Sequence, residues 1–167
     1  MSIVRRATVE ELRYLKAIID HQLGVDVGDV LFDGGVKLKI SKNTGRIREV
    51  YDSNNRRLAS IRASSYTFNL TLVAAGVIHR VVKPPKLRAV VVNEVVPYVT
   101  KGSTLFARHV LSIDEDLRAG DEVLVVDEED NLLCVGRLVL SPLEVLHFIK
   151  GPAVKLRECV GGSRGDG

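Results

Sequence analysis

Residues 87–110 read LRAVVVNEVVPYVTKGSTLFARHV, and this stretch decides how the second half of the chain is expected to fold. The β-branched run over 87–92 is typical of a strand, and Asn93-Glu94 after it favours a short helix over 94–100. Gly102 is expected to end that helix, and residues 103–110 to run on as a strand. A strand, a short helix and a second strand therefore open one compact β domain.

The turn over residues 100–104 carries the first candidate site. Lys101 supplies a positive charge, Gly102 can expose backbone N–H groups, and Ser103 adds a hydroxyl. A lysine, open backbone N–H groups and hydroxyls at one corner suit the binding of a phosphate. The alternative is a plain turn that ends a helix and exposes polar residues.

The sequence after this turn predicts a single small barrel. Apolar strands are expected over 121–127 and 132–140, joined by an acidic hairpin, and a last strand over 153–159. Ser141-Pro142-Leu143-Glu144 is a capping box with proline at the first helical position. A short helix should therefore interrupt the strands.

The first half of the chain predicts an α+β domain. The capping box Thr8-Val9-Glu10-Glu11, with apolar residues at helical spacing through Asp20, indicates an amphipathic helix. Turn residues between alternating segments predict a four-stranded meander, a further short strand and a second helix. The expected strands are 30–32, 36–40, 46–51, 56–62 and 66–70, and the second helix is 71–81. Lys83-Pro84-Pro85-Lys86 is expected to be a stiff linker, because two prolines can neither continue a helix nor enter a sheet ladder.

The composition, with 46% apolar and 27% charged residues, is that of an ordinary globular protein. No apolar run reaches the roughly 18 residues of a membrane span, and the N-terminus lacks a signal-peptide core. We therefore expect a cytoplasmic protein without a membrane partner. Only the tail over 161–167 is expected to be disordered. Cys134 and Cys159 fall in separate expected strands, and buried free thiols are the expectation for both.

Charge is divided unequally along the chain. Residues 1–86 contain 15 Lys and Arg against 8 Asp and Glu, a net charge of +7, whereas residues 87–167 contain 9 against 13, a net charge of −4. A polyanion is therefore expected to contact the first half and selected edges of the second. The acidic segment 114–130 should repel RNA and is where a basic protein partner is expected.

The order of the segments in the second half resembles a PUA domain, the RNA-binding pseudobarrel shared by many RNA-modifying enzymes. The segments that carry the resemblance are Lys101-Gly102-Ser103, Phe106-Ala107-Arg108-His109-Val110, Ala119-Gly120-Asp121-Glu122-Val123, Leu133-Cys134-Val135-Gly136-Arg137 and Gly151-Pro152-Ala153-Val154-Lys155. More narrowly, the chain is similar to the C-terminal accessory and PUA domains of archaeosine tRNA-guanine transglycosylases. The resemblance implies an α+β accessory domain over residues 1–86, followed by an all-β PUA pseudobarrel with short helices over 87–160.

The resemblance also implies where RNA would bind. Similar PUA domains hold RNA along the glycine turn, the adjoining helix, the second strand and the last strand. The positions that match are Lys101, Gly102, Ser103, Thr104, Arg108, Lys155 and Arg157. A secondary RNA-binding face is expected on the strands of the first half, although exposed cations there also serve solubility. Its members are Lys37, Lys39, Arg46, Arg48 and Arg62.

Two further side chains of the second half have competing interpretations. Phe106 is expected in the core, with stacking on an unpaired base as the alternative. Arg137 follows Gly136 in an otherwise apolar strand and is either a buried, paired arginine or an RNA contact.

The sequence carries no motif for catalysis, for a cofactor or for a metal. A Walker loop, a G-x-S-x-G elbow and an H-E-x-x-H pair are all lacking, and the four histidines are far apart. We therefore predict a non-enzymatic protein without cofactor or metal that recognises structured, tRNA-like RNA. The alternatives are the RNA-binding subunit of a split tRNA-guanine transglycosylase, with a separate catalytic chain as partner, and a ribosome-biogenesis factor that binds rRNA.

Overall fold

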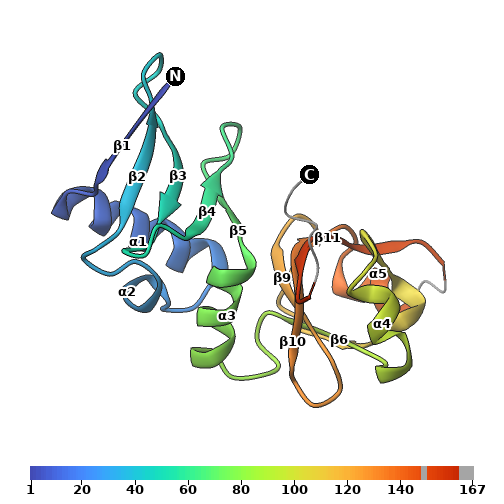
Figure 1. Ribbon diagram of the computed structural model, residues 1–167. Coiled ribbons are helices and arrows are strands. Elements are labelled where there is room, and N and C mark those ends of the chain that lie inside the picture. The colour runs from blue at the N-terminus through green and yellow to red at the C-terminus, as the bar shows by residue number, and fades with distance from the viewer. Residues whose placement is uncertain (148–149, 162–167) are drawn as a thin grey trace. The chain divides into compact units, whose positions relative to one another are not determined.

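The computed structural model describes residues 1–147 and 150–161. The chain divides into two compact units, Met1–Val81 and Val82–Gly167, and each has its own sheet (Figure 1). Of the tail expected to be disordered, residues 162–167 lie outside the described residues.

The first unit is a five-stranded antiparallel sheet with helices on one face (Figure 1). Its strands lie side by side in chain order, as a meander requires. The register partners Leu38, Val50, Ala59 and Leu70 are almost fully buried and form the apolar face of the sheet. The elements are β1 (Ser2–Arg6), α1 (Val9–Leu23), α2 (Gly28–Leu31), β2 (Lys37–Ser41), β3 (Ile47–Tyr51), β4 (Arg57–Ile61), β5 (Phe68–Leu70) and α3 (Leu72–Val81).

Helix α1 begins where its capping box predicts. The Glu11 N–H donates to the Thr8 hydroxyl at 3.1 Å, and the Thr8 N–H donates to the Glu11 carboxylate at 2.9 Å. Gly24 ends the helix in the left-handed conformation that glycine adopts without steric cost. The buried face of the helix consists of Leu15, Ile19 and Leu23.

Two expectations for the first unit are wrong. Residues 30–32 are not a strand, because the Asp20 carboxylate accepts the N–H groups of Val27 and Gly28 at 2.8 and 2.7 Å and so starts the short helix α2. Strand β1 is an addition to the expected meander. All five of its residues are exposed, so no alternation of apolar and polar side chains marks it, and it forms only by pairing its backbone with β2 at the sheet edge.

Among its described residues, the second unit has a six-stranded sheet in the order β7-β11-β10-β9-β6-β8. Strand β6 runs parallel to β9, and the other neighbours are antiparallel. The elements are β6 (Arg88–Val91), η1 (Asn93–Val95), α4 (Val96–Val99), β7 (Thr104–Phe106), η2 (Ala107–His109), β8 (Val110–Ile113), β9 (Glu122–Val126), β10 (Leu132–Leu138), α5 (Pro142–His147) and β11 (Pro152–Cys159). The short helices η1, α4 and α5 and the strands β6, β9, β10 and β11 lie where the sequence predicts them.

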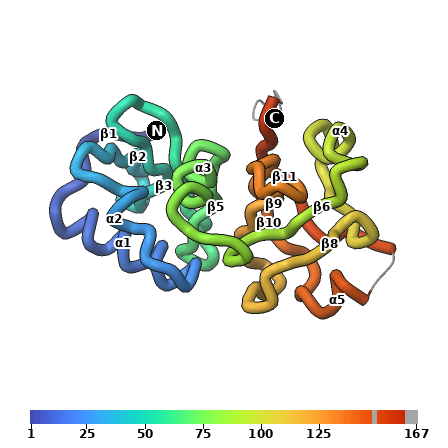
Figure 2. The backbone as a smooth tube through the Cα atoms, turned by 90° about the horizontal axis from the view of Figure 1, so that it is seen from below, coloured from blue at the N-terminus to red at the C-terminus, as the bar shows by residue number. Residues whose placement is uncertain are grey.

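The corner at η2 closes the sheet into a pseudobarrel. Strands β7 and β8 are its two edges, yet only the three residues of η2 separate them in the chain, so the sheet has to curl until its edges meet. Figure 2 shows strands β6, β8, β9, β10 and β11 of this unit. Ala107 is buried at this corner and donates its N–H to the Gly151 carbonyl at 2.9 Å. The single strand expected over 103–110 is therefore wrong, because its first part pairs with β11 and its continuation pairs with β6.

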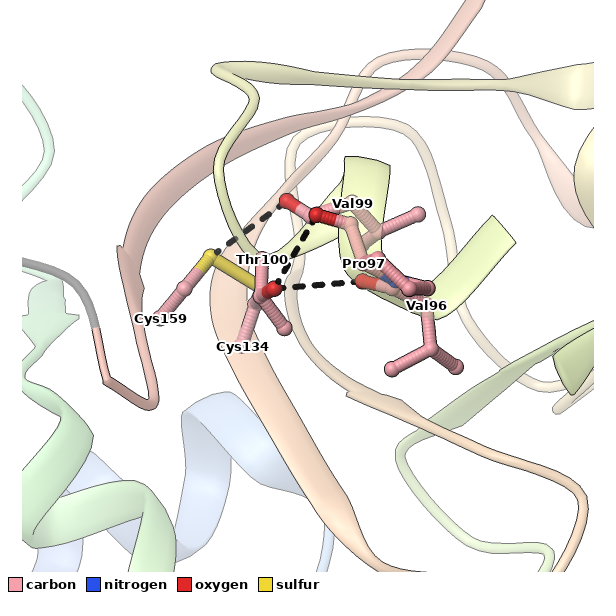
Figure 3. Close-up of a disulfide and its surroundings, with 6 residues drawn as sticks. All are labelled: Val96, Pro97, Val99, Thr100, Cys134 and Cys159. Atoms are coloured by element: carbon pink, nitrogen blue, oxygen red, sulfur yellow. Dashed lines mark hydrogen bonds between the residues drawn. A yellow bond between two sulfur atoms is a disulfide. The ribbon is translucent and has the colours of Figure 1, made fainter. Parts of the chain in front are cut away.

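A disulfide joins Cys134 on β10 to Cys159 on β11. The two cysteines are register partners on neighbouring antiparallel strands, and both are buried. Figure 3 shows the bridge beside the last turn of α4, where Cys159 approaches the Val99 carbonyl. The expectation of free thiols is wrong because a sequence separation of 25 residues does not reveal that two positions face each other across a ladder.

Candidate nucleic-acid interface

The candidate interface is built on a row of side chains that crosses three strands of the second unit. Thr104 on β7 is the register partner of Lys155 on β11, which in turn is the partner of Arg137 on β10. Directly opposed residues point to the same face of a sheet, so the three side chains lie on one face. Lys155 is exposed, and Thr104 and Arg137 are half-buried. We call this set the Lys155 row.

Gly136 allows the strands of the row to approach each other. A Cβ atom at this position would collide with the Lys155 carbonyl oxygen of the neighbouring strand. The register also shifts between Val135 and Gly136, where β11 carries one extra residue, Arg157, and so forms a bulge. Beside it lies a pocket of about 190 Å³ lined by Arg137, Lys155, Leu156 and Arg157. Three of the four lining residues are cations, so the pocket suits an anion.

Arg157 is held by a carboxylate rather than presented to solvent. Its guanidinium donates to both oxygens of Glu122, at 2.6 and 2.9 Å, and the side chain of Glu122 is only 3% exposed. A bidentate pair of this kind fixes the planar guanidinium. Arg157 therefore lines the pocket with its guanidinium held by Glu122, which lies on β9 as the register partner of Arg137, while Lys155 is the exposed cation of the row.

The turn before β7 differs in one respect from its expected geometry. The Gly102 N–H is directed at the Val99 carbonyl, to which it donates at 3.2 Å, so it does not face outward. A Cβ atom at Gly102 would lie 3.1 Å from the Tyr98 carbonyl oxygen, and glycine is needed for this close approach. Lys101 and Ser103 are both exposed. The Ser103 carbonyl accepts the Leu156 N–H at 3.0 Å, which joins the turn to the strand that carries Lys155.

Arg108 lies at the end of β7, on the corner η2. Its guanidinium is 5.5 Å from the centre of the Phe106 ring, in cation–π contact. Phe106 is 41% exposed, so its expected core position is wrong: the buried residue of β7 is Leu105, which points to the opposite face. Phe106 and Thr104 are two residues apart on one strand, which places them on the same side of the sheet.

The buried arginine of the second unit is Arg88, a residue the sequence did not single out. Its side chain is 1% exposed and pairs with Asp130 at 3.1 Å, and it also donates to the Lys86 carbonyl at 3.0 Å. The β6 strand and the tip of the β9–β10 hairpin are joined in this way. Arg137, the other candidate for a buried arginine, is half-buried on the Lys155 row.

The acidic segment 114–130 is largely occupied with its own loops. Asp114 accepts the Leu87 N–H at 2.8 Å, and Asp127 accepts the side-chain and backbone N–H groups of Asn131. Burial alone would raise the pKa of Asp127, but the hydrogen bonds from Asn131 and Glu129 outweigh it and lower the pKa. These carboxylates hold turns together, which weakens the case for a basic protein partner at this segment.

The cations of the expected basic face of the first unit fall into two groups, and those of the first group are held by acidic or polar side chains. Lys39 and Arg57 both pair with the Glu49 carboxylate, at 3.2 and 3.0 Å, and Lys37 donates to Asn55 at 2.8 Å. Burial alone would raise the pKa of Glu49, but the hydrogen bonds from Arg57 and Lys39 outweigh it and lower the pKa. The positive charge of this patch is therefore partly neutralised.

The remaining cations of that face lie elsewhere. Arg46 is exposed in the turn before β3, where its guanidinium is 5.6 Å from the centre of the Tyr66 ring. Arg48 is exposed at the position where the β2–β3 register shifts. Arg62 follows β4 and is half-buried. Arg48 also lines a second pocket together with Lys39 and Glu49. Sequence alternation alone could not show this arrangement, because a register irregularity changes which side chains lie together.

Comparison with known families agrees with this architecture. Residues 88–160 match the model of the PUA domain. The second unit is a PUA domain. Residues 13–85, ahead of this PUA domain, match the model of the patch-forming domain C2 of tRNA-guanine transglycosylase. Both parts of the resemblance found in the sequence are confirmed.

The curated proteins that this chain resembles include archaeal tRNA-guanine(15) transglycosylases. The chain is 40% identical over 153 residues to a tRNA-guanine(15) transglycosylase from Methanobrevibacter smithii, and 36% identical over 161 residues to one from Pyrococcus abyssi. These alignments cover 92% and 96% of this chain but 23% and 27% of the relatives. The chain therefore spans about a quarter of the length of the curated relatives it matches.

Solved structures share the complete two-part fold. A hypothetical protein from Pyrococcus horikoshii matches with a TM-score of 0.72 and 17% identity, and a conserved PUA domain protein from Thermoplasma acidophilum matches with 0.66 and 17%. Both alignments cover 96% of each chain. At such low identity the likeness concerns the fold, and it confirms an α+β part followed by a PUA pseudobarrel.

No helix within residues 1–147 and 150–161 is long and apolar enough to cross a membrane. In the same residues, no three His, Cys, Asp or Glu side chains form a group that could hold a metal ion.

Proposed function

We propose that this chain binds structured, tRNA-like RNA through its PUA domain and does not itself catalyse a reaction. The observation that carries the proposal is the Lys155 row, which lies next to the exposed Lys101 turn in a domain of an RNA-binding family. The cytoplasm is the proposed location. Any guanine exchange would need a catalytic domain beyond these 167 residues.

The dimensions of the row support contact with a nucleic-acid backbone. Neighbouring strands lie about 4.8 Å apart, so three strands span roughly 10 Å, which is wider than a single phosphate requires. Proteins recognise double-helical RNA mainly through phosphates and 2′-OH groups, because side chains cannot read its deep major groove. Lysine and hydroxyl groups on an exposed strand face suit such contacts. They set the register of the RNA more than they read its sequence.

The proposal is tested by titrating the full chain with tRNA at several salt concentrations. The affinity should fall by roughly 0.7 to 0.9 log units per log unit of salt for each phosphate neutralised. Lys155→Ala and Lys101→Ala should each weaken binding and lower the salt slope by about one. Affinity that is indifferent to salt would contradict the proposal.

A matched control is Lys83→Ala, which removes an equally exposed lysine of the same unit outside the row. Its affinity and salt slope should stay close to those of the wild type. If Lys83→Ala and Lys155→Ala weaken binding equally, the chain binds RNA through its overall charge, and the row is not the interface.

A second candidate function is the RNA-binding part of a tRNA-guanine transglycosylase that acts together with a separate catalytic chain. The observation that favours it is the 40% identity to a tRNA-guanine(15) transglycosylase over 92% of this chain. Affinity purification from the native cell, followed by a guanine-exchange assay, tests this candidate. Crosslinking in the same cells distinguishes tRNA from the rRNA that a ribosome-biogenesis factor would bind.

A further inference from the structure

A second candidate site lies in the first unit, where α1 meets the turns of the sheet. A pocket of about 380 Å³ opens there, within the size range of small-molecule sites. Its apolar lining includes Leu15 and Ile18 from α1, Ile47 from β3 and Ile61 from β4. The proposed function, which uses the PUA domain, does not involve this pocket.

Two exposed tyrosines line the pocket together with the apolar residues. Tyr14 on α1 is 66% exposed, and Tyr66 in the β4–β5 turn is 54% exposed. Tyrosine rings at an apolar pocket offer flat faces for stacking. Every nucleobase has a π-face that can stack on such rings, irrespective of its identity.

Tyr66 is in an unusual backbone conformation. Its φ is 55°, in the left-handed region, and its N–H donates to the Arg62 carbonyl at 2.9 Å to close the turn. Glycine, asparagine or aspartate normally occupies such positions, and a bulky residue there is an outlier. Strain of this kind concentrates at functional sites.

The charge at the pocket is positive. Arg46 and Arg48 are both exposed and line it, and the Arg46 guanidinium makes the cation–π contact with Tyr66. Among the described residues that line the pocket there is no Asp or Glu. An anion attached to a flat apolar group therefore matches the site better than a neutral or cationic ligand does.

We propose that this pocket binds one unpaired nucleobase of an RNA, stacked against Tyr66 and Tyr14, with its phosphate at Arg46 and Arg48. The inference rests on the proposed function for the presence of RNA near the chain. It adds a contact in a second domain that reads an extruded or single-stranded nucleotide, whereas the Lys155 row contacts backbone.

The experiment is an NMR titration of the full chain, labelled at its tyrosines, with adenosine 5′-monophosphate. The chain has four tyrosines and no tryptophan, so Tyr51 and Tyr98 serve as references in the same spectrum. A stacked base should move the ring signals of Tyr14 and Tyr66 upfield in a saturable way. Ribose 5-phosphate, which lacks the base, should leave them in place.

Variants at Tyr66 separate binding from folding. Tyr66→Gly should weaken adenosine monophosphate binding by about five- to a hundredfold, while its Tm stays within a few degrees of the wild type, because glycine adopts this φ without strain. Tyr66→Phe keeps the ring and should retain the affinity. Tyr66→Gly with unchanged affinity would overturn the inference.

The same series distinguishes this inference from the proposed function. Lys101→Ala and Lys155→Ala should weaken tRNA binding but leave the shifts caused by adenosine monophosphate intact. If these lysines matter for tRNA and no saturable shift occurs at Tyr14 and Tyr66, the inference fails and the proposed function stands. The pocket would then be assigned to an apolar side chain of a protein partner instead of a nucleobase.

Discussion

The two units of this chain differ in which of their cations are paired with a carboxylate. On the outer face of the first sheet, Lys39 and Arg57 share the Glu49 carboxylate. On the Lys155 row, the only buried carboxylate nearby among the described residues, Glu122, is engaged by Arg157, and Lys155 remains exposed. The position of one carboxylate thus decides whether neighbouring cations are presented to a polyanion.

The net charges of the two units, taken alone, would place the interface for a polyanion on the first unit. Residues 1–81 hold 13 Lys and Arg against 8 Asp and Glu, a net charge of +5, and residues 82–167 hold 11 against 13, a net charge of −2. The unit with the negative balance nevertheless presents Lys101 and Lys155 as exposed cations, because several of its carboxylates hold turns and strand ends. Charge counts are a guide to non-specific attraction but not to the location of an interface.

The largest expected difference between the units concerns the disulfide. Replacing both cysteines in Cys134→Ala/Cys159→Ala removes a link across 25 residues and should lower the stability of the PUA domain by about 3 kcal/mol. Hydrogen exchange of the full chain is the measurement. Amides of β10 and β11 should exchange faster, while those of the first unit serve as an internal control and should not change.

Removing the Glu122 carboxylate, which lies opposite Arg137 of the Lys155 row, should lower stability less than losing the disulfide does. It should also change the affinity for tRNA. Glu122→Gln removes the charge from the bidentate Arg157–Glu122 pair and should destabilise the PUA domain by about 2 kcal/mol, less than a fully buried pair because Arg157 is partly exposed. Urea denaturation measures this cost. The released guanidinium should raise the affinity for tRNA at low salt. Glu94→Gln, at an exposed position, is the control, and equal behaviour of the two variants would contradict the comparison.

The corresponding change in the first unit tests whether its sheet face contributes to RNA binding. Glu49→Gln frees Lys39 and Arg57, so the salt slope of tRNA binding should rise by up to about two. The cost in stability should be below about 1 kcal/mol, since the pairs are near the surface. Glu10→Gln on the exposed side of α1 is the control. An unchanged slope for Glu49→Gln would restrict the interface to the PUA domain.

The smallest expected effect is a pH dependence in the first unit. Hydrogen bonds from Arg5, which outweigh burial, lower the pKa of Glu11 from 4.5 to about 2. A carboxylate with a lowered pKa in the folded state stabilises the fold above its unfolded pKa, and this contribution is lost as the pH falls from about 4.5 towards 2. Glu11→Gln should therefore flatten the acid limb of a Tm-against-pH curve for this unit, and an unaltered limb would contradict the assignment.

Local signals predicted the elements that local interactions build. The capping boxes at Thr8 and Ser141 start helices as expected, and the apolar runs of β9 and β10 are strands. The predicted elements were wrong where a distant segment decides the structure. Strand β1 forms by pairing with β2, and helix α2 depends on the Asp20 carboxylate. The corner η2 interrupts a run of high strand propensity because the sheet edges have to meet there.

The candidate site was predictable in part for the same reason. Lys101, Thr104 and Lys155 were expected from the resemblance, and the structure brings Thr104 and Lys155 into register. Arg137 joins them by a pairing that no single segment reveals. The exposure of Phe106 could have been suspected from its alternation with Leu105, which is the buried residue of that strand.

The sequence by itself determined the capped helices, the apolar strands of the second unit and the residue types at the glycine turn, because propensity, capping and spacing act over a few neighbouring residues. The fold family followed from the resemblance to PUA domains. Only the tertiary structure decided which cations share a face, which of them meet a carboxylate, and that Cys134 and Cys159 form a bridge. Strand register sets these outcomes. A shift of one residue moves a side chain to the other face of a sheet, and register depends on partners distant in sequence.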